Sequence, residues 1–210
     1  MARGDCSKLV TPTPERVEAA LKQFNDANAV GEKALGELFK QYPSNGDLHH
    51  VFLKVVALNF LYSTRILLHS TKVRDVGDVA DHIYRIHRDI DAALNAHAPN
   101  PEIVDRIAKI PVIGKRDIGC FSFATKYCSW HEPKSYPIWD SNVELYLQCL
   151  QKQTDFGDDF KLKGDWKYSD FLGVMTRLSK RYGLDSFTFK DIDKFLWSEG
   201  ERLKNSGKQI

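Results

Sequence analysis

Apolar residues recur at intervals of three and four along most of this chain, and this spacing restricts its fold more than any other feature. The spacing places side chains on one face of an α-helix. The stretch 76–97 shows it most clearly, with Val79, Ile83 and Ile90 among its apolar positions. Alternating β-branched runs are few, and no Asn-Gly or Asp-Gly turn lies between such runs. The sequence therefore predicts an all-α protein.

The same spacing, together with residues that start and stop helices, predicts a series of helices. The first begins at Thr13, because Thr caps helices well and Pro14 suits a first turn. The others are expected at 29–42, 47–64, 76–97, 101–109, 115–130, 140–153, 168–182 and 189–204. The helix at 47–64 is apolar around most of its circumference, so we expect it in the middle of the bundle.

Size and charge set broad limits on the protein. The chain has 210 residues, of which 42% are apolar, enough for a sizeable core in one or two domains. Its formal charge of +2 is weakly basic, so any affinity for DNA must come from a local patch. No run approaches the roughly 20 apolar residues of a membrane helix, and charges at Arg3, Asp5 and Lys8 argue against a secretory signal. We expect a cytoplasmic or nuclear protein.

Cysteine and histidine spacing argues against disulfides and metals. The four cysteines are too few and too widely spaced for a disulfide scaffold, so free thiols are expected. Cys120 and Cys128 lie eight positions apart in an apolar run, which indicates a buried location. His49 and His50 are adjacent and would face different directions on a helix, so no metal site is expected.

The chemically informative stretch runs from Ile107 to Val143. In it a short helix leads into the tight turn 110–114, a second helix is expected to open with Lys115 and Arg116, and Asp140 stands at the start of the next helix. A helix that opens after such a turn points N–H groups outward, and its dipole favours a bound phosphate. Lys115 and Arg116 add positive charge at that point.

This order resembles the helix-hairpin-helix (HhH-GPD) superfamily of DNA base-excision glycosylases. Their motif is a Leu-Pro-Gly-Val-Gly hairpin, then a helix, then a Pro-Val-Asp-Thr-His segment with the catalytic Asp. Ile110-Pro111-Val112-Ile113-Gly114 corresponds to the hairpin, and 137–143 corresponds to the Asp segment. Val112 replaces the first hairpin glycine, and the segment before Asp140 is one residue longer.

The resemblance implies a two-lobed helical fold. It spans 47–153, which would form the helix-hairpin-helix core. Segments 1–46 and 154–204 would together form the second lobe, and the tail 205–210 is expected to be disordered. The resemblance also implies a monomer that acts on duplex DNA with no iron–sulfur cluster or other cofactor.

The resemblance assigns roles to individual residues. Asp140 would be the catalytic carboxylate, and Lys115 would join it only in a lyase, because Arg116 holds the position of the lyase lysine. Cleavage of an N-glycosidic bond builds positive charge on the sugar, which a carboxylate stabilises. The residues expected to contact DNA are Val112, Gly114, Lys115 and Arg116. The residues expected to line a base pocket are Asn59, Tyr62, Phe195 and Trp197.

Three functions stay open at this point. The first is a glycosylase, either purely hydrolytic or with weak additional lyase activity, that removes a damaged or modified base. The second is a non-catalytic DNA-binding module in which Asp140 only caps a helix. The third is a helical protein–protein adaptor in which the turn is only a tight connection. A DNA-binding module needs the hairpin, but it does not need a carboxylate that the chain brings back to face the hairpin. The role of Asp140 therefore distinguishes the glycosylase from the binding module.

Overall fold

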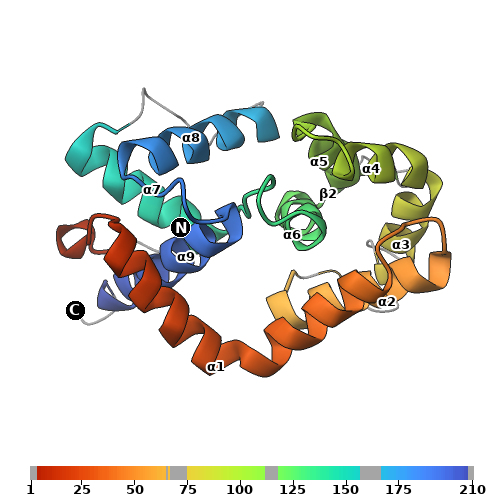
Figure 1. The fold of residues 1–210 in the computed structure, drawn as a ribbon, viewed down its shortest axis with the longest axis horizontal. Coiled ribbons are helices and arrows are strands. Elements are labelled where there is room, and N and C mark those ends of the chain that lie inside the picture. The colour runs from red at the N-terminus through yellow and green to blue at the C-terminus, as the bar shows by residue number, and fades with distance from the viewer. Residues whose placement is uncertain (1–3, 65, 67–74, 112–117, 157–166, 208–210) are drawn as a thin grey trace. The chain divides into compact units, whose positions relative to one another are not determined.

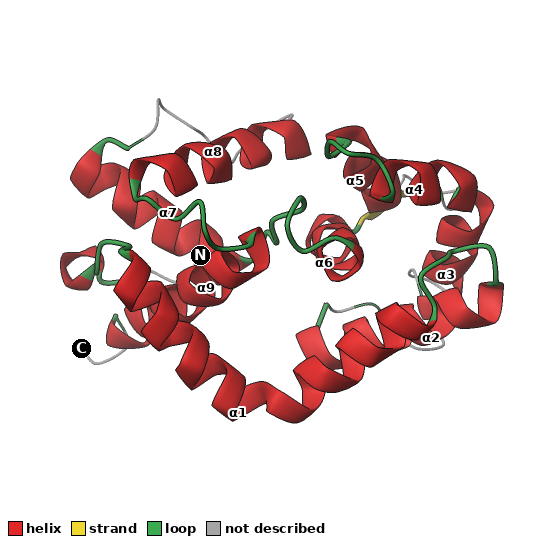
Figure 2. Cartoon of the chain, in the orientation of Figure 1, coloured by secondary structure: helices red, strands yellow, loops and turns green. Residues whose placement is uncertain are grey.

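The computed structural model describes residues 4–64, 66, 75–111, 118–156 and 167–207. Within these residues the chain is all-helical, with nine α-helices, one short 3-10 helix and two strands of two residues (Figures 1 and 2). The expected all-α class is therefore confirmed. The chain divides into two compact units, which are described separately. Unit 1 comprises Met1–Asn28 and Pro137–Ile210, and unit 2 comprises Ala29–Tyr136. These boundaries differ from the expected lobes, in which 47–153 forms one core.

Helix α1 (Pro14–Gln41) supplies residues to both units. It begins where the sequence predicts, because the Thr13 hydroxyl accepts the N–H of Arg16. The expected separation into two helices is wrong, because α1 runs through 25–28 without a break. There the Asn28 side chain donates to the Phe24 carbonyl one turn earlier at 2.9 Å, so this polar residue stays compatible with the helix.

In unit 2, helix α2 (Leu48–Tyr62) starts where Asp47 caps it, with the carboxylate accepting the N–H groups of His49 and His50. One face of α2 is buried. The opposite face is exposed in the structure as described, so the expectation that this helix lies in the middle of a bundle is wrong. The buried residues are Val51, Lys54, Val55 and Leu58, and the exposed apolar ones are Leu48, Phe52, Leu53, Phe60 and Leu61.

The long helix expected at 76–97 is two helices, α3 (Val76–Arg85) and α4 (His87–Leu94). They meet at Ile86, whose backbone (φ −104°, ψ 17°) departs from α-helical geometry. The apolar spacing runs through the break, because Ile83 and Ile90 on either side are both fully buried. Periodicity alone could therefore not reveal it.

Helix α5 (Pro101–Ala108) leads into strand β1 (Lys109–Ile110), which pairs antiparallel with β2 (Ile118–Gly119). Helix α6 (Phe121–His131) follows. The expectation that this helix opens at Lys115 is wrong, because the backbone of 118–119 is paired in the small sheet. The N–H of Cys120 then donates to the Ala108 carbonyl at 2.8 Å, and α6 starts after it.

Unit 1 contains α7 (Ser141–Thr154), α8 (Tyr168–Arg181) and α9 (Phe189–Ser206). Helices α7 and α9 approach closely at Gly200, where a Cβ atom would lie 2.1 Å from the Asn142 carbonyl oxygen. Helix α9 continues two residues past its expected end, into the segment predicted to be a disordered tail.

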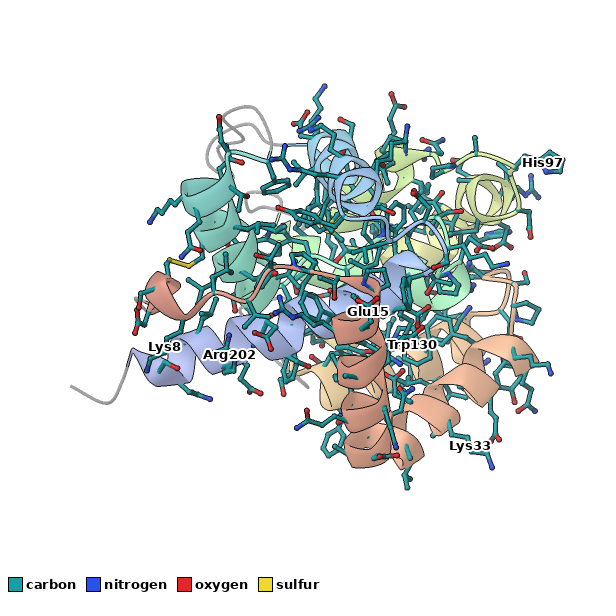
Figure 3. All side chains as sticks on the ribbon, turned by 60° about the vertical axis from the view of Figure 1, so that its left-hand side comes forward. Lys8, Glu15, Lys33, His97, Trp130 and Arg202 are labelled. Atoms are coloured by element: carbon teal, nitrogen blue, oxygen red, sulfur yellow. A yellow bond between two sulfur atoms is a disulfide. The ribbon has the colours of Figure 1, made fainter. Side chains whose placement is uncertain are left out.

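The N-terminal segment of unit 1, which includes the 3-10 helix η1 (Cys6–Lys8), lies against α7 and α9 (Figure 3). Cys6 and Cys149 form a disulfide, so the expectation of four free thiols is wrong for this pair. Tyr146 donates to the Val10 carbonyl at 2.6 Å, and Arg202 donates to the Lys8 carbonyl at 2.7 Å. In unit 2, Cys120 and Cys128 are buried thiols outside the disulfide, as predicted.

Candidate functional site

Asp140 occupies the N-cap of α7, as the sequence predicts. Its backbone is extended (φ −146°, ψ 158°), and its Oδ1 atom accepts the N–H of Asn142 at 3.0 Å. Its carbonyl accepts the N–H of Glu144 at 2.8 Å, which closes the first turn of the helix. The residue is half-buried. The local sequence thus fixes one carboxylate oxygen at a helix start, where the helix dipole favours a negative charge.

The segment before Asp140 is anchored in the core of unit 1. Pro137 and Ile138 are buried, and the Pro137 carbonyl accepts a hydrogen bond of 2.8 Å from the buried Tyr168 hydroxyl. Burial raises the pKa of Tyr146, another tyrosine in the core of this unit. The burial of Pro137 and Ile138 and the hydrogen bond from Tyr168 give Asp140 a rigid support. A carboxylate that must hold a fixed position beside a reacting sugar requires such a support.

The residues expected to contact DNA lie outside the described residues. These are Val112, Gly114, Lys115 and Arg116. The two ends of their segment are described: Lys109 and Ile110 in β1 face Ile118 and Gly119 in β2. Because α6 begins only at Phe121, the N–H groups of its first turn do not belong to the Lys115–Arg116 position. The predicted contribution of this helix start to phosphate docking there is therefore wrong.

Two of the residues expected in a base pocket, Asn59 and Tyr62, lie at the end of α2 in unit 2. The Asn59 side chain donates to the Ile66 carbonyl at 2.8 Å and accepts from the N–H of Ile66 and the Thr64 hydroxyl, both at 2.9 Å. Its amide therefore holds the chain that leaves the helix. Tyr62 donates to Glu32 at 3.2 Å.

The ring of Tyr62 has two further neighbours from α6. The ammonium of Lys126 lies 5.7 Å from its centroid, and the Trp130 ring meets it edge-on at 6.3 Å. Lys126 is nearly fully buried and also donates to the Ser122 hydroxyl at 2.7 Å. Lys126 and Tyr62 therefore form a cation–π contact within unit 2.

The other two pocket candidates, Phe195 and Trp197, belong to α9 in unit 1. Phe195 is buried, with its ring 5.7 Å from that of Tyr146. Trp197 is half-buried and meets Phe24 edge-on at 6.0 Å. Phe195 therefore packs in the core of its unit, whereas Trp197 retains exposed surface.

Sequence reasoning missed the most unusual polar group of unit 2, the fully buried Lys54. Its ammonium donates to the carbonyls of Tyr42 and Ser44 at 3.1 and 3.2 Å and to Asn45 Oδ1 at 2.7 Å. It also lies 3.3 Å from Nε2 of His131. A signal was present, because Lys54 is the only charged residue in the apolar run 51–58.

Burial governs the electrostatics of this cluster. It lowers the pKa of Lys54 to about 8, although the nearby Asp91 carboxylate acts in the opposite direction. It also lowers the pKa of His131 well below its usual value, and the charge of Lys54 adds to that effect. The hydroxyl of Tyr127 donates to Asn45 Oδ1, and burial raises its pKa. His131 is therefore a neutral acceptor at neutral pH, and Lys54 carries the positive charge.

A metal site and a membrane-spanning helix are both absent from the described residues. No group of three or more His, Cys, Asp and Glu side chains there is arranged to hold a metal ion. Of the helices described, none combines the length and apolar character needed to cross a membrane.

Comparison with known proteins gives a family but no activity. Residues 16–135 match the family named HI_0787_N, whose description is an N-terminal domain. A protein of Haemophilus influenzae, named only as uncharacterized, is 33% identical over 136 residues. The aligned part covers 65% of this chain and spans 62% of the relative's length. No solved structure matches the chain.

Proposed function

The chain belongs to the HI_0787_N family, and we propose that this member is a DNA base-excision glycosylase with Asp140 as its catalytic carboxylate. In this proposal it acts as a monomer on duplex DNA in the cytoplasm or nucleus, without a cofactor. The family and its relative bring no substrate with them. The support comes from this chain's own residues, above all from Asp140.

The observation that carries the proposal is the setting of the Asp140 carboxylate. One of its oxygens accepts the N–H of Asn142, and the residue is half-buried after an anchored segment. A half-buried carboxylate held in this way stays rigid and still has surface for a substrate. Rigid placement next to a developing positive charge is the main means by which a carboxylate lowers a barrier.

The proposed reaction is hydrolysis of the bond between the base and C1′ of its sugar. As that bond breaks, its electron pair leaves with the base, which takes up a proton, and positive charge develops on the sugar. Asp140 stabilises this charge and accepts a proton from the water whose oxygen joins C1′. The bond is inaccessible in a stacked duplex, so the base must first leave the helix.

In this proposal the DNA contact comes from residues 110–114, whose sequence resembles the hairpin of the glycosylase family, and not from the start of α6. Lys115 and Arg116 would add the positive charge. Lys115 would act as a nucleophile only in a lyase. Trapping with borohydride tests this point: we expect no covalent protein–DNA adduct, and an adduct that Lys115→Ala abolishes would assign lyase activity.

A panel of duplexes tests the proposed activity. Each carries one altered base, namely 8-oxoguanine, uracil, a mismatched thymine or a modified pyrimidine, and alkali cleaves the strand wherever a base has been removed. We expect base release from at least one duplex. If none releases its base at enzyme excess over a long incubation, the proposal is wrong.

Asparagine at position 140 provides a matched control for the role of the carboxylate. Asn caps helices about as well as Asp, so Asp140→Asn keeps the start of α7 while removing the negative charge. We expect base release to fall at least about 100-fold with an unchanged melting temperature. Asp140→Ala should lose the activity and also about 1 kcal/mol of stability.

One observation favours a second candidate, a non-catalytic DNA-binding module. The match to the HI_0787_N family ends at residue 135, before Asp140, and the capping bond already accounts for an Asp at that position. A binding module would bind undamaged duplex with an affinity that falls steeply with salt, and it would release no base. In that case Asp140→Asn would change neither stability nor binding.

A further inference from the structure

Two basic side chains, one fully buried and one half-buried, meet in unit 2. The ammonium of Lys54, from α2, lies 3.3 Å from Nε2 of His131, the last residue of α6. An ammonium can only donate hydrogen bonds, so Nε2 must be the acceptor and the imidazole must be neutral. Lys54 is fully buried, and the His131 ring packs against Phe39 at 4.9 Å and Tyr127 at 5.1 Å. This contact tolerates one positive charge but not two.

The partners of Lys54 belong to one loop. Its ammonium also binds the carbonyls of Tyr42 and Ser44 and the side chain of Asn45, all between α1 and α2. The Asp91 carboxylate, from α4, accepts the Asn45 N–H at 3.1 Å and the Ser44 hydroxyl at 2.9 Å. The loop 42–47 is therefore held to α2, α4 and α6 through one polar cluster, in which Lys54 and Asn45 are fully buried.

The charges around His131 balance only while it is neutral. The half-buried Asp91 carboxylate binds the loop, and its negative charge offsets that of Lys54. Tyr127, next to His131 on α6, is a neutral donor to Asn45. Cys128 is likewise neutral, because burial raises its pKa.

The outer side of the loop carries its own ionisable groups. The rings of Tyr42 and His50 stack at 3.9 Å, and Asp47 lies 3.9 Å from His50. His87 lies beside Gly46, because a Cβ atom added to Gly46 would be 3.6 Å from the His87 ring. His50 keeps 40% of its side chain exposed, so its charge is far better solvated than a charge on His131.

We propose that Lys54 and His131 form an acid-sensitive latch, which holds the loop 42–47 closed at neutral pH and releases it as the pH falls. Protonation of His131 would place a second cation in contact with the fully buried Lys54 ammonium. It would also turn one of the four groups around that ammonium from an acceptor into a donor. The closed loop can accept that proton only by opening, which lets water reach both groups.

The direction of the pH effect follows from the depressed pKa of His131. The opened or unfolded segment takes up a proton near pH 6.5, whereas the closed form does not. The stability that neutral His131 gives the closed form is therefore fully present above pH 6.5 and falls progressively as the pH drops below it. One proton makes the opening equilibrium rise up to about tenfold for each pH unit.

Hydrogen exchange measured between pH 7.5 and 5.0, corrected for the intrinsic exchange rate, tests the latch in the full chain. We expect opening of peptides covering 42–54 to increase up to about tenfold per pH unit below 6.5. His131→Gln should remove this increase. His97→Gln, a change at an exposed histidine (Figure 3), should keep it. An unchanged pH response in His131→Gln, or loss of the response in a His50→Gln and His87→Gln double variant, would overturn the proposal.

Two measurements keep the test decisive if His131→Gln does not fold. Lys54→Met removes one of the two cations, so the acid-induced increase should become smaller than in the wild type. In the wild type, the nuclear magnetic resonance signal of the His131 ring should not titrate between pH 7 and 5 while the loop is closed. Titration of that ring near pH 6.5 without increased exchange of 42–54 would contradict the latch.

Discussion

The two units stabilise their structures by different means. Unit 1 joins its N-terminal segment to α7 through the Cys6–Cys149 disulfide, and α7 meets α9 at Gly200 with backbone almost in contact. Unit 2 instead surrounds a buried ammonium, Lys54, with carbonyl groups and a neutral histidine. A covalent link and tight packing do not depend on pH, whereas a buried cluster of ionisable groups does.

This difference predicts that the two units respond to different conditions. Unit 1 should lose stability in a reductant and unit 2 in acid. Hydrogen exchange followed by mass spectrometry separates the two, because peptides from 29–136 and from 137–207 report on different units.

The largest effect should come from opening the disulfide. Its two cysteines are separated by 143 positions, so the bond removes much conformational freedom from the unfolded chain. We expect Cys6→Ser to lower the stability of unit 1 by about 4 kcal/mol, with little change in unit 2. Reductant should have the same effect on the wild type and none on Cys6→Ser. A wild type that melts identically with and without reductant would mean that the bond contributes nothing.

A methyl group at Gly200 should have the next largest effect. Because its Cβ atom would lie 2.1 Å from the Asn142 carbonyl oxygen, α7 and α9 must move apart to admit it. We expect Gly200→Ala to destabilise unit 1 by about 3 kcal/mol in urea denaturation. Gly173→Ala is the matched control on α8, where the nearest atom is the Arg177 side chain at 3.7 Å. If both variants unfold at the wild-type midpoint, the packing argument fails.

Removing one hydroxyl from the polar cluster should have the smallest effect. Tyr127→Phe deletes the donor to Asn45 Oδ1, but that oxygen still accepts from Lys54. We expect unit 2 to lose about 1 kcal/mol of stability, with unit 1 unaffected. Tyr84→Phe changes a more exposed hydroxyl and should have no effect. Equal losses of stability in the two units would contradict the prediction that each unit responds to its own changes.

The parts of the fold that depend on local sequence could be predicted. The starts of α1, α2 and α7 follow from Thr13, Asp47 and Asp140, whose side chains accept N–H groups two or three residues along the chain. The break at Ile86 could not be predicted, because buried apolar residues continue on both sides of it. The Cys6–Cys149 disulfide could not be predicted either, because no local spacing relates residues that lie 143 positions apart.

The candidate site shows the same limit. The cap at Asp140 is local and was predicted, whereas the roles of Asn59 and Lys54 depend on partners brought by folding. Asn59 was expected in a pocket, but its amide holds Ile66 and Thr64. In the sequence, Lys54 is a single charge within an apolar helix, and nothing nearby names its partners. Its partners come from the loop 42–47 and from α6, which folding brings to it. The prediction that Asn59 contacts an extruded base is untested.

The rate of base release by Asp140→Asn tests the central claim most directly. The measurement is a single-turnover rate on whichever duplex the wild type cleaves, with the melting temperature recorded for both proteins. We predict a rate at least about 100-fold lower at an unchanged melting temperature, because the capping bond remains while the carboxylate charge is gone. A rate equal to that of the wild type would contradict the claim and leave Asp140 as a helix cap.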